Sequence, residues 1–231
     1  MQNRRDVLAL GGAMGLAAFT GASAAEPMGL SRLRTRLFNF KDDVSADKAA
    51  ELVAGLKASA QGAQGFMAGR NFIPDPFPTR FEWIYMVQSA ADGPDRGEDQ
   101  FSSARDTLAS FCRNQVECDI RGVFPPKYAD AAGVGVRHTV MFDFKPGTMD
   151  EDRTRNVEAI RQMGKLPMVR SYLVQPCTGP SSDPIQMQWQ VVGDFASVAD
   201  YQAYVAAPVH LAIREDFTAH TSRVAFLDVK L

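Results

Sequence analysis

The sequence predicts an α+β fold in which one unit of strands and helices occurs twice in tandem. The first observation is internal similarity. RTRLFNFKDDVSADKAAELVAGLK, at 34–57, and RHTVMFDFKPGTMDEDRTRNVEAIR, at 137–161, both show an alternating strand, a turn and an acidic helix. Matching Phe40 with Phe144 gives an offset of 104 residues, about the size of one small domain. The second observation is composition: 231 residues, 45% hydrophobic and 23% charged, suffice for two domains of about 100 residues.

The second copy is expected to follow the order β-α-β-β-α-α-β. Residues 136–144 alternate between apolar and polar positions, which places every second residue on one face of a strand. That face carries His138, Val140, Phe142 and Phe144. We expect Thr148 to cap the following helix and Ser197 to cap a later one. Pro208 separates that later helix from another, and RVAFLDVKL closes the copy as a strand.

The first copy is less regular. We expect strands at 32–40, 66–73, 81–88 and 117–124, and helices at 46–59 and 99–114. The stretch PPKYADAAGVG at 125–135 is then the linker between a first domain at 30–124 and a second at 136–231.

The first 25 residues differ from the rest of the chain. They contain Arg4 and Arg5, then a mildly apolar run rich in Gly and Ala, then Ala22-Ser23-Ala24. This order predicts a twin-arginine signal peptide over 1–25 and a periplasmic mature chain, with an uncleaved N-terminal helix as the alternative. Later apolar runs are too short to span a bilayer, so no membrane contact is expected after signal cleavage.

Charge and cysteine content limit the partners. A net charge of −2 gives no electrostatic reason to expect nucleic acid. The three cysteines, Cys112, Cys118 and Cys177, leave at least one thiol free or intermolecular in an oxidising compartment. Cys112 and Cys118 can form a disulfide if the chain turns between them, whereas a helix through both would prevent it. No CxxC motif occurs and the three histidines are scattered, so neither a metal site nor a cofactor is expected.

Residues 136–231 resemble the Dabb family, the stress-responsive dimeric α+β barrel domains. The resemblance rests on RHTVMFDFKPGT, on a helix that ends before LPMVRSY, and on ADYQAYVAAPVHLAI before the final strand. It implies a ferredoxin-like unit, and the tandem copies are similar to a covalently linked version of the barrel that two such units form. Residues 30–124 resemble the family only faintly. Within the family, the second copy is similar to the olivetolic acid cyclase-type domains, which act without metal or cofactor.

The cyclase-type resemblance implies an active site in the second copy. By motif, Tyr204 and His210 match the catalytic pair on the late helix, and His138 matches a histidine on the first strand. Imidazole can serve as general acid or base near neutrality, and a Tyr hydroxyl can stabilise an oxygen that gains negative charge. A helix break at Pro208 is expected to let Tyr204 and His210 face one pocket. Trp189 falls near a position that is His in the cyclases, so the resemblance does not imply that this chain shares their substrate.

Three residues are candidates for substrate binding. Trp189 and Phe142 offer aromatic surface to an aromatic ligand. Arg34, which aligns with His138, can hold a carboxylate or a phenolate. Its neighbours Arg32 and Arg36 share its strand face, and a solvated edge strand is the alternative interpretation of this row. The first copy contains no histidine, so we expect it to act as a scaffold.

The candidate acid/base residues also have structural interpretations. Tyr204 and Trp189 can be core aromatics, His210 a satisfied histidine at a helix start, and His138 an edge-strand histidine. His220, near a helix end where a cation complements the dipole, is interpreted as structural.

These features lead to a functional hypothesis: a cofactor-independent periplasmic enzyme that acts on a small aromatic or phenolic compound. The expected reaction is acid/base-driven carbon–carbon chemistry, either a retro-aldol-type lyase step that releases an aldehyde or an aldol-type cyclisation. Export favours the lyase, because thioester substrates are cytosolic. His210 is expected to remove the proton with His138 assisting, while Tyr204 stabilises the oxyanion.

Two other functions stay open at this point. One is a stress-response or small-ligand-binding barrel without catalysis. The other is a haem-handling barrel with His138 or His210 as axial ligand. The sequence also leaves open a homodimer formed through exposed sheet edges.

Overall fold

The computed structural model describes residues 29–60, 62–73, 81–90, 98–125, 127–178 and 185–231, and the predicted signal peptide lies outside them. The first unit contains β1 (Gly29–Phe40), α1 (Ala46–Ser59), β2 (Gly65–Arg70), β3 (Trp83–Ala90), α2 (Glu98–Ser110) and β4 (Cys112–Phe124). The second contains β5 (Val136–Phe144), α3 (Asp150–Met163), β6 (Val169–Pro176), β7 (Trp189–Phe195), α4 (Val198–Ala206), α5 (Pro208–His220) and β8 (Thr221–Lys230). A short 3₁₀ helix, η1 (Tyr128–Asp130), lies in the predicted linker.

Each unit forms one antiparallel sheet of four strands. The strand orders are β2-β3-β1-β4 and β6-β7-β5-β8, so the first strand of each unit is central and the last strand lies at an edge. The matching orders confirm the predicted duplicated α+β fold. Within the described residues, the first unit has the single helix α2 where the second has α4 and α5. The order β-α-β-β-α-α-β therefore applies to the second copy alone.

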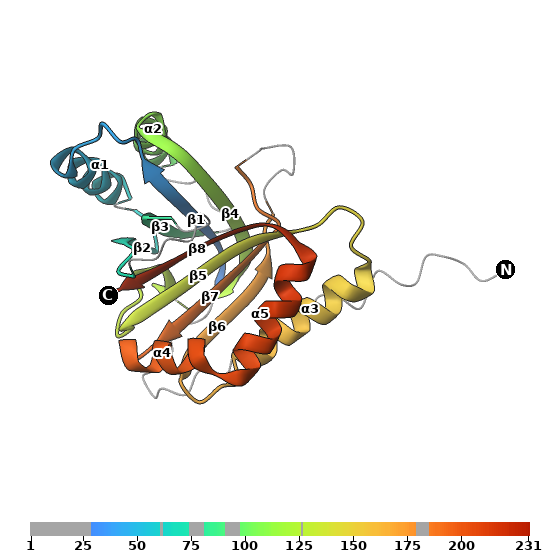
Figure 1. Ribbon diagram of the computed structural model, residues 1–231. Helices are drawn as coiled ribbons and strands as arrows, with labels where there is room; N and C mark the ends of the chain where they lie inside the picture. Colours follow the sequence, from blue (N-terminus) through green and yellow to red (C-terminus); the bar gives the residue numbers. More distant parts are fainter. Residues whose placement is uncertain (1–28, 61, 74–80, 91–97, 126, 179–184) are drawn as a thin grey trace.

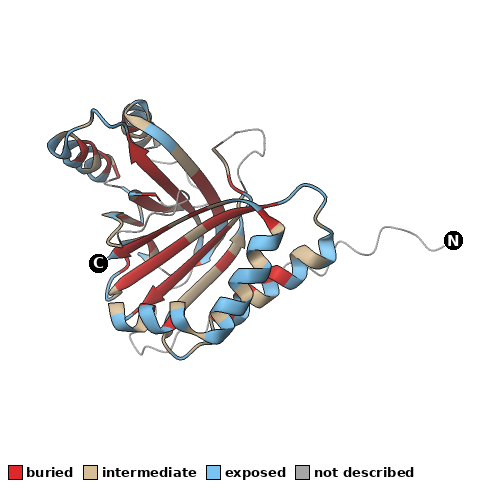
Figure 2. Cartoon of the chain, viewed as in Figure 1, coloured by how far each residue is buried: buried red, intermediate tan, exposed pale blue. Residues whose placement is uncertain are grey.

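The two sheets pack face to face, and the helices lie on their outer sides (Figure 1). Strand alternation produces this arrangement, because successive side chains point to opposite faces. In β1, Leu33 and Leu37 join Met141 of the second unit in the core between the sheets. Phe38 and Phe40 of the same strand point to the other face and pack beneath α1 and α2. Figure 2 shows the buried residues concentrated on the strands. No described helix is long and apolar enough to cross a membrane.

A buried ion pair links the linker to the core between the sheets. Arg137 is 1% exposed. Its Nε and Nη2 donate to the two carboxylate oxygens of Asp194, at 2.7 and 2.9 Å. Its Nη1 donates to the carbonyl oxygen of Tyr128 at 3.1 Å, and its Cζ lies 4.7 Å from the centre of that ring. The guanidinium is therefore satisfied by residues of β7 and η1.

In each unit, a segment outside the sheet forms a backbone hydrogen bond with the edge strand of the other unit. The backbone N–H of Phe72 donates to the carbonyl of Asp228 on β8, at 3.1 Å. Reciprocally, the N–H of Thr178 donates to the carbonyl of Asp119 on β4, at 2.6 Å. At these points the edges of β4 and β8 are paired inside the chain and are not open to another chain.

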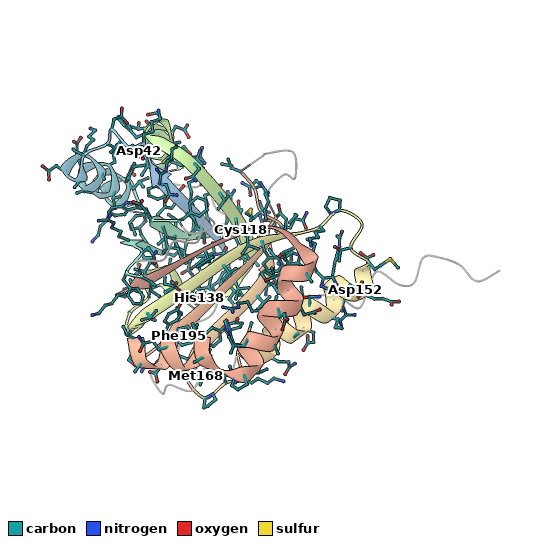
Figure 3. The ribbon with its side chains drawn as sticks, in the orientation of Figure 1. Asp42, Cys118, His138, Asp152, Met168 and Phe195 are labelled. Atoms are coloured by element: carbon teal, nitrogen blue, oxygen red, sulfur yellow. A yellow bond between two sulfur atoms is a disulfide. The ribbon has the colours of Figure 1, made fainter. Side chains whose placement is uncertain are left out.

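A disulfide joins the two units. It connects Cys118 on β4 with Cys177, just after β6, and Cys112 is free. Figure 3 labels Cys118 where β4 runs beside the second sheet. The predicted alternative of a Cys112–Cys118 bond is wrong. Both residues lie on β4, and six residues of extended strand separate their Cα atoms by about 20 Å.

The boundary between α2 and β4 differs from the prediction. The predicted helix at 99–114 ends instead at Ser110, and the strand predicted to begin at 117 begins at Cys112. Residues at the start of β4 pair with β1, where Gln115 lies opposite Phe38. Pairing with the central strand therefore overrides the local helical pattern.

One of the two predicted helix caps is present. The Ser197 side chain accepts from the N–H of Asp200 and caps α4, as expected. The prediction for Thr148 is wrong, because α3 has Met149 at its N-cap without a side-chain bond. The Thr148 hydroxyl donates to the carbonyl of Lys145 instead, at 2.8 Å, and stabilises the preceding turn.

Candidate active site

Four residues of the second unit lie in one row across its sheet. They are Tyr172 on β6, Gly193 on β7, His138 on β5 and Asp228 on β8, each opposite the next in register. Residues directly opposite one another in neighbouring strands share a face of the sheet. This face is the one covered by helices, since His138 contacts the rings of Tyr201 and Tyr204 from α4. Figure 3 shows His138 and Phe195 on this sheet, near α4.

His138 and Asp228 form a buried pair. The imidazole Nδ1 lies 2.6 Å from Asp228 Oδ1, and Asp228 is fully buried. An ionised carboxylate can only accept a hydrogen bond, so Nδ1 donates and Nε2 remains to accept a proton. This is the arrangement by which a carboxylate orients a general-base histidine.

The Tyr204 ring contacts the rings of both His138 and His210. Its ring centre lies 6.0 Å from that of His138 and 4.7 Å from that of His210. The second contact exists because α4 ends at Ala206 and α5 begins at Pro208, so the helix direction changes between Tyr204 and His210. Burial raises the pKa of Tyr204 to about 12. The phenol therefore stays protonated near neutral pH and can act as a donor.

The Tyr204 hydroxyl has a partner that the sequence analysis did not select. It lies 2.8 Å from the Tyr172 hydroxyl and 3.6 Å from the sulfur of Met163. Burial, with the neighbouring Tyr204 as the next cause, raises the pKa of Tyr172 well above its ordinary value. With Tyr172 as donor, Tyr204 directs its own proton to the Met163 sulfur, which is a weak acceptor.

His210 is neutral near neutral pH. Burial lowers its pKa to about 4, and the charges of His138 and Arg214 act in the same direction. A hydrogen bond with the backbone of Val205 opposes the shift. Its Nδ1 is buried and has no hydrogen-bond partner among the described residues. The imidazole is thus a neutral hydrogen-bonding group with one buried nitrogen unused.

Gly193 and Asp228 were also missed by the sequence analysis. A Cβ on Gly193 would lie 3.1 Å from the Tyr172 ring, so the glycine leaves room for that ring between β6 and β7. Asp228 had a local signal that could have selected it: it is the one acidic residue in the apolar strand RVAFLDVKL. Its partner could not be identified without the pairing of β5 with β8.

Trp189 and Phe142 lie together, away from His138. Their rings stack at 6.3 Å, and Phe142 also contacts Phe217 of α5 at 4.8 Å. Phe142 is fully buried and lies four residues from His138, about 13 Å along the strand. The structure therefore places this aromatic group in the core beneath α5.

Arg34 lies on the first sheet, on its outer, helix-covered side. It is 8% exposed, and its Nε lies 4.0 Å from Glu117. Arg36 on the same face bonds Glu117 and is 4% exposed. A solvated edge strand is therefore the wrong interpretation of this row, because β1 is central and its arginines are ion-paired. The core between the sheets separates Arg34 from His138.

His220 lies outside the cluster formed by His138, Tyr204 and His210. Its Nδ1 lies 2.9 Å from the carbonyl of Asp216 at the end of α5, in agreement with a structural role. Among the described residues, no group of three or more His, Cys, Asp or Glu side chains could hold a metal ion.

Residues 136–231 match the model of the Dabb family, described as the Stress responsive A/B Barrel Domain. The match covers every element that carries the site and leaves out the first unit. No curated protein matches the chain.

Solved structures resemble the chain in fold. A Dabb family protein from Mesorhizobium loti is 22% identical, with a TM-score of 0.36 over 42% of this chain and 95% of its own. The hydroxynitrile lyase of Passiflora edulis is 17% identical, with a TM-score of 0.39 over 42% and 92%. A protein of Fusobacterium nucleatum subsp. nucleatum, provisionally assigned as a monooxygenase, is 7% identical, with a TM-score of 0.55 over 87% and 92%. The last covers both units and supports the duplicated barrel-like fold.

Proposed function

We propose that the chain is a periplasmic, cofactor-independent enzyme whose second unit carries out acid/base carbon–carbon chemistry on a small aromatic or phenolic compound. A lyase step that releases an aldehyde is the favoured direction, and an aldol-type cyclisation is its reverse. The observation that carries the proposal is the buried His138–Asp228 pair, 2.6 Å apart, facing the hydroxyl-bearing ring of Tyr204. Such a set can take up a proton and stabilise an oxyanion at the same site.

In the lyase direction, His138 Nε2 removes the proton of the substrate hydroxyl. The carbon–carbon bond then breaks as the hydroxyl carbon becomes the aldehyde carbonyl. The electron pair of that bond passes to the aromatic or carbonyl fragment, whose oxygen gains negative charge and accepts a hydrogen bond from Tyr204. The imidazolium returns its proton to the carbanionic carbon, so atoms and charge balance.

This scheme exchanges the two histidine roles expected from the sequence. A pKa near 4 makes His210 a weak base, whereas Asp228 stabilises the imidazolium that forms on His138. The neutral imidazole of His210, whose ring contacts that of Tyr204, suits a hydrogen bond with a second substrate hydroxyl, such as a phenol. We therefore assign proton transfer to His138 and substrate orientation to His210.

The periplasmic location is supported by two features of the chain. The twin-arginine pattern at the N-terminus is typical of exported proteins. The Cys118–Cys177 disulfide suits an oxidising compartment, since disulfides rarely persist in the cytosol.

The test is a mass-spectrometric turnover screen of free phenolic and lignin-type aromatics, without added cofactor. The wild-type chain is compared with His138→Gln and with His220→Gln, a matched control at the end of α5. We expect product with the wild type and with His220→Gln, and a loss of about 10²–10⁴ in rate with His138→Gln. The product mass would distinguish aldehyde release from cyclisation.

Two results would contradict the proposal. Equal turnover in His138→Gln would remove His138 from the chemistry. Compounds that raise the melting temperature but stay unchanged would favour a ligand-binding barrel without catalysis.

A further inference from the structure

We propose that the first unit completes the site of the second, with Asn71 and Phe72 as positioning residues for the His138–Asp228 pair. This inference rests on the proposed function of that pair. It assigns an active-site role to the unit that has no histidine of its own. The contact runs across the junction of the two units, where the segment after β2 lies along the edge of β8.

The first step concerns the backbone of Asp228. Its carbonyl accepts from the N–H of Phe72 at 3.1 Å, and its own N–H donates to Asn71 Oδ1 at 3.4 Å. A strand residue directs both groups to the same side, so those of Asp228 point away from β5 and toward the first unit. His138 and Asp228 are therefore a non-hydrogen-bonded pair of the ladder, the kind in which side chains approach most closely. This explains how the short side-chain contact arises.

The second step concerns the Asn71 side chain. Its Nδ2 donates to the carbonyl of Ile73 at 2.9 Å, and its Oδ1 also accepts from the N–H of Ile73 at 3.3 Å. One amide thus shapes the segment and bonds Asp228. Without it, the N–H of Asp228 would lose a partner at a fully buried residue, which carries a desolvation cost.

The third step concerns the Phe72 ring. It meets the Tyr201 ring edge-on at 6.2 Å, and Tyr201 lies 5.7 Å from the His138 ring. Phe72 and Ile73 pack against the core of the second unit beneath its helices. Phe72 therefore supports the aromatic wall that limits the movement of the imidazole.

A glycine shows that the two units are shaped for this contact. A Cβ on Gly69 of β2 would lie 2.4 Å from Cγ1 of Val229, the residue after Asp228. Only a residue without a side chain lets β2 approach β8 this closely. The approach that Asn71 and Phe72 need is thus built into the preceding strand.

The test uses proton NMR of the full chain. The sequence has three histidines, so the Nδ1–H resonance of His138 can be assigned with His138→Gln. We expect Asn71→Ala and Phe72→Ala to speed exchange of this proton with water by about threefold to tenfold. The first variant loses the hydrogen bond to Asp228, and the second loses the ring contact with Tyr201. Asn114→Ala, an exposed asparagine on β4, should leave the exchange rate unchanged.

Conservative variants separate positioning from a general loss of structure. Phe72→Leu keeps apolar contact without the ring and should give an intermediate rate, and Asn71→Ser should partly restore the bond. Far-UV circular dichroism and the melting temperature identify variants that fail to fold. If an alanine variant does not fold, the conservative variant at the same position is used to measure the exchange rate instead. Unchanged exchange in all folded Asn71 and Phe72 variants would overturn the inference. That result would leave the proposed function standing, which fails separately if His138→Gln retains full turnover.

Discussion

The same row of the sheet is used differently in the two units. In the second unit the row is Tyr172, Gly193, His138 and Asp228. In the first unit the corresponding row is Phe66, Val87, Arg34 and Asp119. Both rows lie on the outer, helix-covered face, and both end in an aspartate on the edge strand. The remaining positions differ in chemistry.

The difference shows how one scaffold holds either an arginine–aspartate pair or a histidine–aspartate pair. Asp119 accepts from Nε of Arg32 at 2.7 Å, and a guanidinium keeps its proton at any physiological pH. Asp228 instead bonds Nδ1 of the His138 imidazole, which leaves the second ring nitrogen to accept a hydrogen bond or a proton. Val87 fills the position that Gly193 leaves open for the Tyr172 ring. The aspartate position is therefore shared, and its partner decides the chemistry.

The largest expected effect comes from the two aspartates. Asp228→Asn should lower turnover of a compound found in the screen by about 10²–10⁴, because an amide no longer holds His138 in the basic tautomer. Asp119→Asn should lower the melting temperature and leave turnover unchanged, because its partner is Arg32. Steady-state rates and thermal melts of both variants provide the measurement. Equal rate losses in the two variants would erase the functional difference between the units.

The inward face offers a second comparison. Arg137 pairs with Asp194, whereas the equivalent residues of the first unit are Leu33 and Gln88. Arg137→Leu should cost about 3–5 kcal/mol in urea unfolding, because it leaves the Asp194 carboxylate buried without its charge partner. The double variant Arg137→Leu/Asp194→Gln copies the first unit and should recover most of this loss. If the double variant is no more stable than Arg137→Leu, the Leu and Gln of the first unit cannot replace the Arg137–Asp194 pair in the second.

The disulfide provides a third test. Cys177→Ser should lower the free energy of unfolding by about 2–4 kcal/mol, because the bond closes a loop across 59 residues between the units. Cys112→Ser removes the free thiol and should have a smaller effect. Denaturant unfolding with and without reductant measures both. A reductant effect that persists in Cys177→Ser would contradict the Cys118–Cys177 pairing.

Gly193→Ala makes the second row more like the first. The new methyl would lie 3.1 Å from the Tyr172 ring and should displace it, at a cost of about 1–3 kcal/mol. The bond from Tyr172 to Tyr204 should weaken, so the titration of the tyrosines in ultraviolet absorbance should change. Gly55→Ala, in α1 with nothing within 4 Å, is the control and should stabilise slightly. If Gly193→Ala has the stability and the tyrosine titration of the wild type, the Tyr172 ring can accommodate the new methyl group without being displaced.

The smallest effect concerns pH. His210 has a pKa of about 4 in the folded chain and an ordinary value of 6.5. The unfolded chain therefore binds the proton first, so His210 lowers stability as the pH falls from 6.5 to 4. His210→Phe should flatten the stability curve in this range, whereas His220→Gln should not. A fold as pH-sensitive in His210→Phe as in the wild type would contradict the buried, neutral state.

Features that depend on residues close together in the sequence could be predicted from it. The duplicated strands, the Ser197 cap and the helix break at Pro208 all follow from local periodicity, capping and proline chemistry. The start of β4 was mispredicted because its pairing with β1 decides it. Asp228 and Tyr172 were missed because their partners lie on other elements, 90 and 32 residues away.

The sequence by itself determined the two tandem α+β units, and its resemblance to the Dabb family singled out Tyr204, His210 and His138 as acid/base candidates. Alternation and helix breaks act over a few residues, so they can be seen without the fold. The tertiary structure alone decided that Asp228 orients His138, that Cys118 bonds Cys177, and that Asn71 and Phe72 border the site. These contacts depend on strand register and on the docking of the two units, which bring together residues far apart in the chain.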